Sequence, residues 1–353
     1  MSLFKKVKVK DIRKETPDAV SVAFDIDDEI KSEFTYQPGQ YITIKRTIDG
    51  EDVRRSYSLS SFPNEEDFRI AVKKIPLGKM SSYLNNDLNV SDELEIMAPQ
   101  GNFVLTPQNN QHYVGFAAGS GITPIISMLK TVLTQTNSIY TLFYGNKTEM
   151  ATIFKKELDE LHEQYKERFT LNYIYSQQSS PDKLFEGRIT KTKFEELVRA
   201  DIELLKADGF FLCGPEQMID EVSSGLSYLG VNKDKIHFEL FTTPVKSSEP
   251  QTIIDSDFAG VSQVTVIMDG EEIAFDLPSD GNFILDAAIE NGVDAPFSCK
   301  GAVCCTCKAQ VIEGKAMMEM NYSLSDEEVE EGFILTCQSH PVTEKIVVDF
   351  DVI

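Results

Sequence analysis

Four cysteines near the C-terminal end of the chain have a spacing that suits iron chemistry. Cys299, Cys304 and Cys307 form a C-x4-C-x2-C run, and Cys337 follows after 29 further residues. Two bridged irons need four thiolates that converge on one compact group, and this is the plant-type spacing of [2Fe–2S] ligands. We therefore predict that these four cysteines hold a [2Fe–2S] cluster.

Zinc binding and inert burial are the alternatives for these thiols. A zinc ribbon normally has two C-x2-C knuckles, whereas this chain has one such pair, Cys304 and Cys307. Buried cysteines can also serve as small apolar side chains. Gly301 and Ala302 favour the cluster, because small residues let the loop backbone approach it closely. Cys305 falls outside the ligand spacing, and we predict that it is not a ligand.

The composition bounds the class of protein that carries this motif. A chain of 353 residues is long enough for two or three domains, each with its own core. No apolar run approaches the length of a membrane span, and the N-terminus has no apolar stretch before a cleavage site. Six cysteines, four of them in the cluster pattern, fit a reducing compartment. We expect a cytoplasmic protein that does not enter a membrane.

The charge excludes one class of partner. The net charge is −23, and residues 258–353 hold 18 acidic and 4 basic residues. Nucleic acids are bound by basic faces, so we expect no nucleic-acid partner. An acidic face around a redox centre can steer a basic protein partner, although the same charge can simply keep the domain in solution.

The first segment, residues 1–108, is expected to form a small antiparallel β-barrel. Short strands alternate with turn-rich stretches such as Gln37-Pro38-Gly39. The expected strands are Lys5–Lys10, Ala19–Asp25, Tyr41–Arg46, Val53–Ser58, Phe68–Lys73 and Glu93–Met97.

The second segment, residues 109–243, is expected to form an α/β domain with a parallel sheet, because strands alternate with helices. Nucleotides bind such sheets at the carboxyl ends of the strands. The expected strands are Tyr113–Ala117, Ile139–Gly145, Phe169–Tyr175, Gly209–Cys213 and Lys235–Phe241. The expected helices start at Thr123, near Met150, near Lys191 and at Glu216.

Three pieces of the first segment could hold a flavin nucleotide. They are Arg55-Ser56-Tyr57-Ser58, Ile70–Lys73 and the Gly78–Leu84 turn. A guanidinium can bind a phosphate, a tyrosine can lie on an aromatic ring, and a Gly-then-Ser turn opening a helix can face a pyrophosphate. A surface ion pair and a half-buried strand aromatic are the plain alternatives for Arg55 and Tyr57.

The order of these pieces resembles the ferredoxin–NADP reductase superfamily. The resemblance implies that Arg55, Tyr57 and Ser58 contact a flavin and that the turn holds the pyrophosphate of FAD, which FMN lacks. The implied flavin-binding residues are Arg55, Tyr57, Ser58, Val72, Lys73, Gly78, Met80, Ser81, Ser82 and Phe241.

The second segment contains a G-x-G-x-x-P turn, Gly119 to Pro124, whose glycines permit close backbone approach and whose proline suits a helix start. Together with Cys213-Gly214-Pro215, it resembles the nicotinamide-binding half of the same superfamily. The implied nicotinamide-binding residues are Gly119, Ser120, Gly121, Thr123, Pro124, Ser176, Cys213 and Gly214.

The resemblance also implies three residues at the reacting rings: Ser58, Cys213 and Glu239. Cys213 would lie against the nicotinamide, although a buried apolar thiol is its plain reading. Phe241 matches an aromatic that stacks on the flavin, but it ends the chain in many family members and does not do so here.

Residues 244–257 are Ser-, Thr- and Pro-rich and are expected to be a linker. Residues 258–353 resemble the β-grasp fold of plant-type ferredoxins. The expected elements are a hairpin of Gln263–Met268 and Glu272–Leu277, helices at Asn282–Glu290 and near Ser325–Glu330, and strands at Phe333–Cys337 and Lys345–Asp349.

The order of modules predicts an electron relay. A nicotinamide delivers a hydride, a [2Fe–2S] cluster takes one electron at a time, and a flavin can do both. No second metal-ligand cluster or haem-attachment motif occurs in the sequence, so the electrons must leave for an outside acceptor.

Three C-terminal segments identify a candidate acceptor. Pro296–Cys304, Met320–Leu324 and Phe333–Gln338 resemble the reductase subunits of phenylacetyl-CoA epoxidases, which are bacterial di-iron multicomponent oxygenases. The resemblance covers essentially the whole chain and implies an epoxidase as partner. A general reductase for a Rieske-type or other oxygenase, and a redox sensor that does not turn over, remain alternatives.

The preference for NADPH is also implied by resemblance, with NADH possible. Relatives that use NADPH often carry Ser-Arg where this chain has Ser176-Gln177-Gln178. The arginine would bind the 2′-phosphate, so its absence leaves Lys147 or Arg188 as the replacement or favours NADH.

Overall fold

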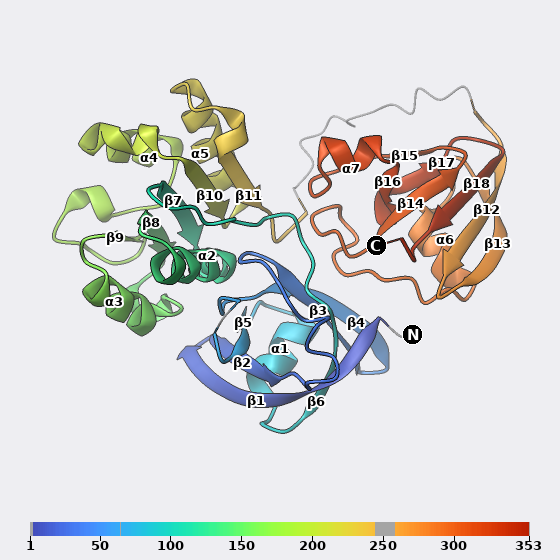
Figure 1. The fold of residues 1–353 in the computed structure, drawn as a ribbon, viewed down its shortest axis with the longest axis horizontal. Coiled ribbons are helices and arrows are strands. Elements are labelled where there is room, and N and C mark those ends of the chain that lie inside the picture. The colour runs from blue at the N-terminus through green and yellow to red at the C-terminus, as the bar shows by residue number, and fades with distance from the viewer. Residues whose placement is uncertain (1–2, 64, 244–257, 353) are drawn as a thin grey trace.

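A computed structural model describes residues 3–63, 65–243 and 258–352. The chain forms three lobes, coloured blue, green to yellow, and orange to red in Figure 1. The predicted linker, residues 244–257, lies outside the described residues. No helix in the described ranges is long and apolar enough to cross a membrane.

The first lobe is a six-stranded antiparallel barrel, as predicted. Its strands lie in the order β4-β3-β6-β1-β2-β5, and a bridge between Leu59 and Ile70 joins the β4 and β5 edges. Its core is aliphatic and includes Ile42 and Ile44, both fully buried. The elements are β1 Phe4–Thr16, β2 Ala19–Asp25, β3 Tyr41–Ile48, β4 Glu51–Ser58, β5 Phe68–Lys73, α1 Lys79–Asn86 and β6 Glu93–Met97.

The second lobe has a five-stranded parallel sheet in the order β11-β10-β7-β8-β9, with helices on both faces. From β7 the chain adds β8 and β9 on one side and later β10 and β11 on the other, which creates a topological switch point. The strands are β7 His112–Ala118, β8 Ile139–Asn146, β9 Phe169–Tyr175, β10 Gly209–Cys213 and β11 Ile236–Glu239. The helices are α2 Ile122–Gln135, α3 Lys155–Gln164, α4 Lys191–Ala200 and α5 Glu216–Tyr228.

The first two lobes share an apolar core. Ala71, Phe103 and Leu105 of the barrel region belong to the same buried cluster as Ile125 and Leu129 of α2. Burial of a continuous apolar surface between two domains fixes their relative position. The barrel and the parallel sheet therefore form a rigid frame for any site between them.

The third lobe is a five-stranded mixed sheet in the order β13-β12-β18-β14-β16, and α6 packs against its core. The β12 and β18 strands pair in parallel. The elements are β12 Val261–Met268, β13 Glu271–Pro278, α6 Ile284–Glu290, β14 Lys308–Glu313, β15 Ala316–Met318, α7 Asp326–Glu330, β16 Phe333–Leu335, β17 Ser339–Pro341 and β18 Lys345–Asp349.

The structure corrects several predicted boundaries. The strand expected at Phe333–Cys337 ends at Leu335, and a 3-10 turn, Thr336–Gln338, presents Cys337. The last strand of the second lobe ends at Glu239, so Phe241 lies beyond it. The helix expected near Met150 is a 3-10 turn at Glu149–Ala151 followed by α3. The sequence also missed β14, a strand inside the third sheet.

Candidate functional site

The three residues expected at the reacting rings come together where the barrel meets the parallel sheet. Ser58 ends β4, Cys213 ends β10 and Glu239 ends β11. The Ser58 hydroxyl donates a hydrogen bond to a Glu239 carboxylate oxygen at 3.2 Å, and Cys213 is the in-register neighbour of Glu239. The strand ends of two domains therefore converge on one point.

Burial sets the protonation states of Cys213 and Glu239. Cys213 is completely buried, and desolvation holds the pKa of its thiol well above the ordinary value, so the thiol stays neutral. Desolvation also raises the pKa of Glu239 to about 8, although the hydrogen bond from Ser58 lowers it in part. Near neutral pH the carboxyl group of Glu239 can thus be protonated, and Cys213 has no thiolate with which to act as a nucleophile.

Of the predicted flavin contacts on β4, Arg55 and Tyr57 lie on one side of the strand and Ser58 lies on the other. Arg55 is exposed, and its guanidinium donates to the carbonyl oxygen of Arg54 at 2.7 Å. Tyr57 is half-buried, and desolvation raises the pKa of its hydroxyl. An exposed guanidinium and a half-buried ring are available to a phosphate and to an aromatic ring, respectively.

The turn before α1 is held by its own serine. The Ser81 hydroxyl accepts from the amide of Ile75 and donates to the carbonyl of Gly78, each at 3.3 Å. Ser82 is half-buried beside it. In contrast, the side chains of Val72 and Met80 are buried in the barrel core, so only their backbone groups can reach a ligand.

A cleft of about 500 Å³ lies at the carboxyl ends of β7, β8, β9 and β10. Its walls include Gly119, Ser120, Gly121, Ser176 and Gly214, all predicted nicotinamide contacts. This is the edge at which parallel sheets bind nucleotides.

Glycine is required at the base of this cleft. A Cβ atom on Gly121 would lie 2.1 Å from the carbonyl oxygen of Cys213. Real Cβ atoms do not approach a backbone that closely, so a larger residue must displace the turn or the strand end. Thr123 and Pro124 are buried at the start of α2, and the Thr123 hydroxyl bonds the carbonyl oxygen of Ser120 at 3.0 Å. These two residues shape the turn from behind.

The same cleft gathers residues that sequence reasoning named separately or missed. Lys147 and Arg188, the two candidate phosphate-binding cations, line it together with Gln177. Lys73 and Phe241 line it as well, so the barrel and the segment after β11 contribute to its wall. Gly145 and Gly187 also line it and were missed, because neither belongs to a recognisable glycine motif.

The four predicted ligand cysteines are free thiols arranged in two pairs. The sulfurs of Cys299 and Cys304 are 3.1 Å apart, and the neighbouring thiol of Cys337, together with burial, raises the pKa of Cys307 well above the ordinary value. The described ranges contain no cluster of three or more His, Cys, Asp or Glu side chains placed to hold a single ion. Two neighbouring thiol pairs suit two bridged irons better than one tetrahedral zinc.

The loop favours thiolate character at its first position. The Cys304 thiol and backbone amides, including that of Gly301, donate to the Cys299 sulfur and lower the pKa of Cys299 to about 6. The pKa of Cys304 lies well above the ordinary value, because it interacts with this neighbouring thiol and is buried. Metal binding would replace the proton that such a pair shares. The donor set therefore fits the predicted cluster.

The Cys305 thiol is directed toward the backbone of Ser323. The thiol contacts the carbonyl oxygen of Ser323 at 3.3 Å, and burial raises its pKa to about 11. Lys300 and Ala302 have positive φ angles of 51° and 61°, so the loop curls tightly at two positions that are not glycine. This curl turns Cys299 and Cys304 toward each other.

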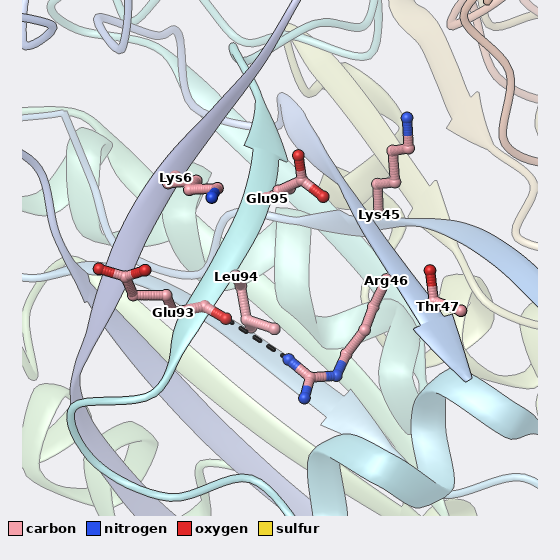
Figure 2. A pocket seen from close by; sticks show the side chains of 7 residues that line it. All are labelled: Lys6, Lys45, Arg46, Thr47, Glu93, Leu94 and Glu95. Atoms are coloured by element: carbon pink, nitrogen blue, oxygen red, sulfur yellow. Dashed lines mark hydrogen bonds between the residues drawn. The ribbon is translucent and has the colours of Figure 1, made fainter. Parts of the chain in front are cut away.

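A hollow elsewhere on the barrel is separate from this site. Figure 2 shows that it lies over β1, β3 and β6, where Arg46 donates to the carbonyl oxygen of Glu93 at 3.4 Å. Both positively and negatively charged side chains line this hollow, and none of the predicted site residues lies in it. We assign it no role.

Family models match each lobe. An oxidoreductase FAD-binding domain matches residues 6–105, an oxidoreductase NAD-binding domain matches residues 116–224, and a 2Fe-2S iron-sulfur cluster binding domain matches residues 266–342. These matches agree with the barrel, the cleft and the cysteine loop. Fold and site thus define an oxidoreductase that carries electrons from NAD(P)H through FAD to a [2Fe–2S] cluster.

Whole-chain comparisons identify the family. The chain is 38% identical to a component of the 1,2-phenylacetyl-CoA epoxidase of Escherichia coli, over 99% of both chains. It is 34% identical to the ferredoxin reductase component of a 3-ketosteroid-9-alpha-monooxygenase from Rhodococcus rhodochrous, over 97% of this chain and 95% of the relative. The structure of phthalate dioxygenase reductase matches with a TM-score of 0.59 at 22% identity, over 98% of both chains, which shows the shared fold. The chain belongs to the family of reductase components that includes the reductase of phenylacetyl-CoA epoxidase.

Proposed function

We propose that this chain is the reductase component of a phenylacetyl-CoA epoxidase and that it uses NADPH. The observation that supports this acceptor is the 38% identity to the E. coli epoxidase component over nearly the whole of both chains. A cytoplasmic location is part of the proposal, because six free cysteines require a reducing compartment.

The chain's own residues have distinct tasks in this scheme. When bound, the flavin supplies the exchange between two-electron and one-electron chemistry. The glycine turn at Gly119–Gly121 admits the nicotinamide nucleotide to the cleft, and the neutral thiol of Cys213 is buried behind Gly121 at the inner end of the turn. Glu239 and Ser58 offer a protonated carboxyl and a hydroxyl at the junction where the two ring systems would meet. The loop cysteines hold the group that passes single electrons outward.

The preference for NADPH rests on two cations. Lys147 and Arg188 both line the cleft beside Ser176 and are exposed, so either side chain can reach a 2′-phosphate. We expect the double variant Lys147→Ala/Arg188→Ala to lower kcat/KM for NADPH by about 10- to 100-fold, because the loss of one charged hydrogen bond to the 2′-phosphate costs roughly 1.5–3 kcal/mol. The value for NADH should change little. The control is Lys156→Ala on α3, and an equal loss with both nucleotides would contradict a 2′-phosphate contact.

The acceptor is tested by reconstitution. The purified chain, NADPH, phenylacetyl-CoA and an epoxidase catalytic component should together form epoxide, and omission of the chain should abolish it. Coupling to a Rieske-type oxygenase is the comparison, since the R. rhodochrous relative is named for a different monooxygenase and favours a general reductase as the second candidate. Turnover with that oxygenase and none with the epoxidase would establish the second candidate. Rapid cytochrome c reduction would exclude a sensor that does not turn over.

A further inference from the structure

The β3–β4 hairpin of the barrel has two faces, and the outer one is covered by the third lobe. On the inner face Ile42 and Ile44 are fully buried in the barrel core. Three of the four cross-strand pairs on the outer face lie against the third lobe, and they are Tyr41 with Ser58, Thr43 with Ser56, and Lys45 with Arg54. Each pair contributes at least one direct contact to residues 294–306 of the third lobe.

Charged contacts lie at the end of this face farthest from the flavin site. The side chain of Arg54 is only 3% exposed and is paired with Asp294 and with Asp52 of its own strand. It also donates to the carbonyl oxygen of Ala295 at 3.2 Å and lies 4.5 Å from the centre of the Phe297 ring. Asp294 in addition pairs with Lys45 at 3.2 Å. A buried guanidinium with this many partners fixes the two lobes in one register.

Hydroxyl contacts extend the seam, meaning the interface between the outer face of the β3–β4 hairpin and residues 294–306, toward the cysteine loop. The Ser56 hydroxyl donates to that of Ser298 at 2.9 Å, and the Thr43 hydroxyl lies 3.3 Å from that of Thr306. This seam is polar, unlike the apolar core that the barrel shares with the second lobe. Polar contacts between domains are typical of interfaces that form and separate.

Tyr41 occupies the end of the seam beside the flavin site. It is only 4% exposed, and its hydroxyl accepts a hydrogen bond from the amide of Cys305 at 3.0 Å and lies 3.3 Å from the hydroxyl of Thr306. Cys305 stands between the ligand cysteines 304 and 307. On the neighbouring strand, the partner of Tyr41 is Ser58, which hydrogen-bonds Glu239. One residue thus spans the predicted flavin contacts and the predicted cluster ligands.

We propose that the outer face of the β3–β4 hairpin is the docking surface for the chain's own ferredoxin domain, and that Tyr41 positions the cysteine loop for electron transfer from the flavin. Charge complementarity supports this occupant, because residues 258–353 carry a net charge of −14 and the hairpin presents Arg54 and Lys45 to them. Covalent attachment raises the effective concentration of the domain. The inference rests on the electron path described above and is independent of the outside acceptor.

A charge reversal tests the docking. Asp294→Lys places a cation beside Arg54 and Lys45, and its side chain is 69% exposed, so the ferredoxin domain should still fold around it. We expect a larger radius of gyration in solution scattering and at least a tenfold slower cluster reduction after a single NADPH pulse. Flavin bleaching and the cluster absorbance should remain as in the wild type. Asp276→Lys, on exposed strand β13, is the matched control and should change neither scattering nor rate.

A second variant tests Tyr41 itself. Tyr41→Phe removes the acceptor of the Cys305 amide, so we expect amide exchange at Cys305 to rise roughly tenfold and cluster reduction from the flavin to slow severalfold. Dithionite reduces the cluster directly and bypasses the flavin, so the rate of this reduction should be unchanged in Tyr41→Phe. A general structural defect would change that rate as well.

The two variants also separate this inference from the proposed function. If Asp294→Lys and Tyr41→Phe both reduce the cluster at wild-type rates with unchanged scattering and exchange, the docking proposal is wrong. A wild-type chain that docks and reduces its cluster but fails to support any epoxidase would instead overturn only the proposed acceptor.

Discussion

The nicotinamide cleft and the cysteine loop serve the same electrons and are built in opposite ways. The cleft is open, with a volume of about 500 Å³, and several glycines line it. The loop is packed: Cys304, Cys305, Cys307 and Cys337 are all buried, and Tyr41 of another lobe covers it. A ligand that enters and leaves in each cycle needs an accessible backbone, whereas a resident group needs fixed ligands and exclusion of water.

The strongest test of this contrast removes one ligand from the packed loop. Cys304→Ser should abolish the cluster, so that reduction of the acceptor protein falls to background while flavin bleaching by NADPH continues in stopped-flow experiments. Cys305→Ser is the adjacent control and should keep its iron and sulfide, since the Cys305 thiol faces Ser323. Loss of flavin bleaching in Cys304→Ser, with FAD bound and the fold intact, would contradict the two-stage path.

The corresponding test in the open cleft fills its base. Gly121→Ala would place a Cβ 2.1 Å from the carbonyl oxygen of Cys213, so we expect KM for the nicotinamide to rise at least about tenfold and the free energy of unfolding to fall by roughly 1–3 kcal/mol. Gly145→Ala is the control in the same cleft. Its Cβ would meet a side-chain methyl group of Ile189 at 3.2 Å, which can move aside. Equal effects from the two alanines would show that the base of the cleft is not constrained.

Glu239, where the barrel meets the parallel sheet, should make the folding stability depend on pH, and we expect this effect to be of intermediate size. Desolvation raises the pKa of Glu239 to about 8 in the folded protein, whereas in the unfolded chain it returns to about 4.5. Above the lower value the unfolded chain has released the proton that the folded protein retains, so folding stability falls as the pH rises from about 4.5 to 8.

The variant Glu239→Gln cannot ionise at this position, so its folding stability should not fall as the pH rises. Relative to the wild type, the variant should gain roughly 1–3 kcal/mol in the free energy of unfolding between pH 5 and pH 9, measured by urea denaturation. Parallel pH profiles for the two proteins would show that the carboxyl group of Glu239 titrates normally.

Salt should produce the smallest effect, and mainly on the transfer of electrons from the cluster to the outside acceptor. The acidic ferredoxin domain can attract a basic partner surface, so electron transfer to the acceptor should slow severalfold between low and high ionic strength. Flavin reduction inside the chain should change less. A transfer rate that is indifferent to salt would mean that the acidic residues of the domain only keep it in solution.

Local patterns were sufficient to predict most of the elements. The strands Ala19–Asp25, Phe169–Tyr175, Gly209–Cys213 and Lys345–Asp349 have the predicted bounds, because apolar strand sequences lie between clear turn signals. Boundaries failed where a short turn replaced regular structure, as at Cys337. The β14 strand escaped notice because it follows the last cysteine of the loop directly, with no turn residue to mark its start.

The candidate site was predictable to the extent that its residues lie in motifs. The sequence named Ser58, Cys213 and Glu239 by resemblance, and the structure brings them together at the junction of two lobes. It could not name Tyr41, because the contact of Tyr41 with Cys305 joins residues 264 positions apart and belongs to no local pattern. Contacts between domains depend on how finished surfaces meet, which no short stretch of sequence encodes.

The alternation of the β3–β4 hairpin restricts how this chain can vary. An insertion or deletion of one residue within a strand turns every following side chain to the opposite face. Such a change in β4 would move Arg54 to the side of Arg55 and uncouple both faces at once. Length variation is therefore expected at the Asp49-Gly50 turn, where φ angles of 53° and 81° already mark the hairpin end, and not between that turn and Ser58. Insertions and deletions among natural relatives should respect that division.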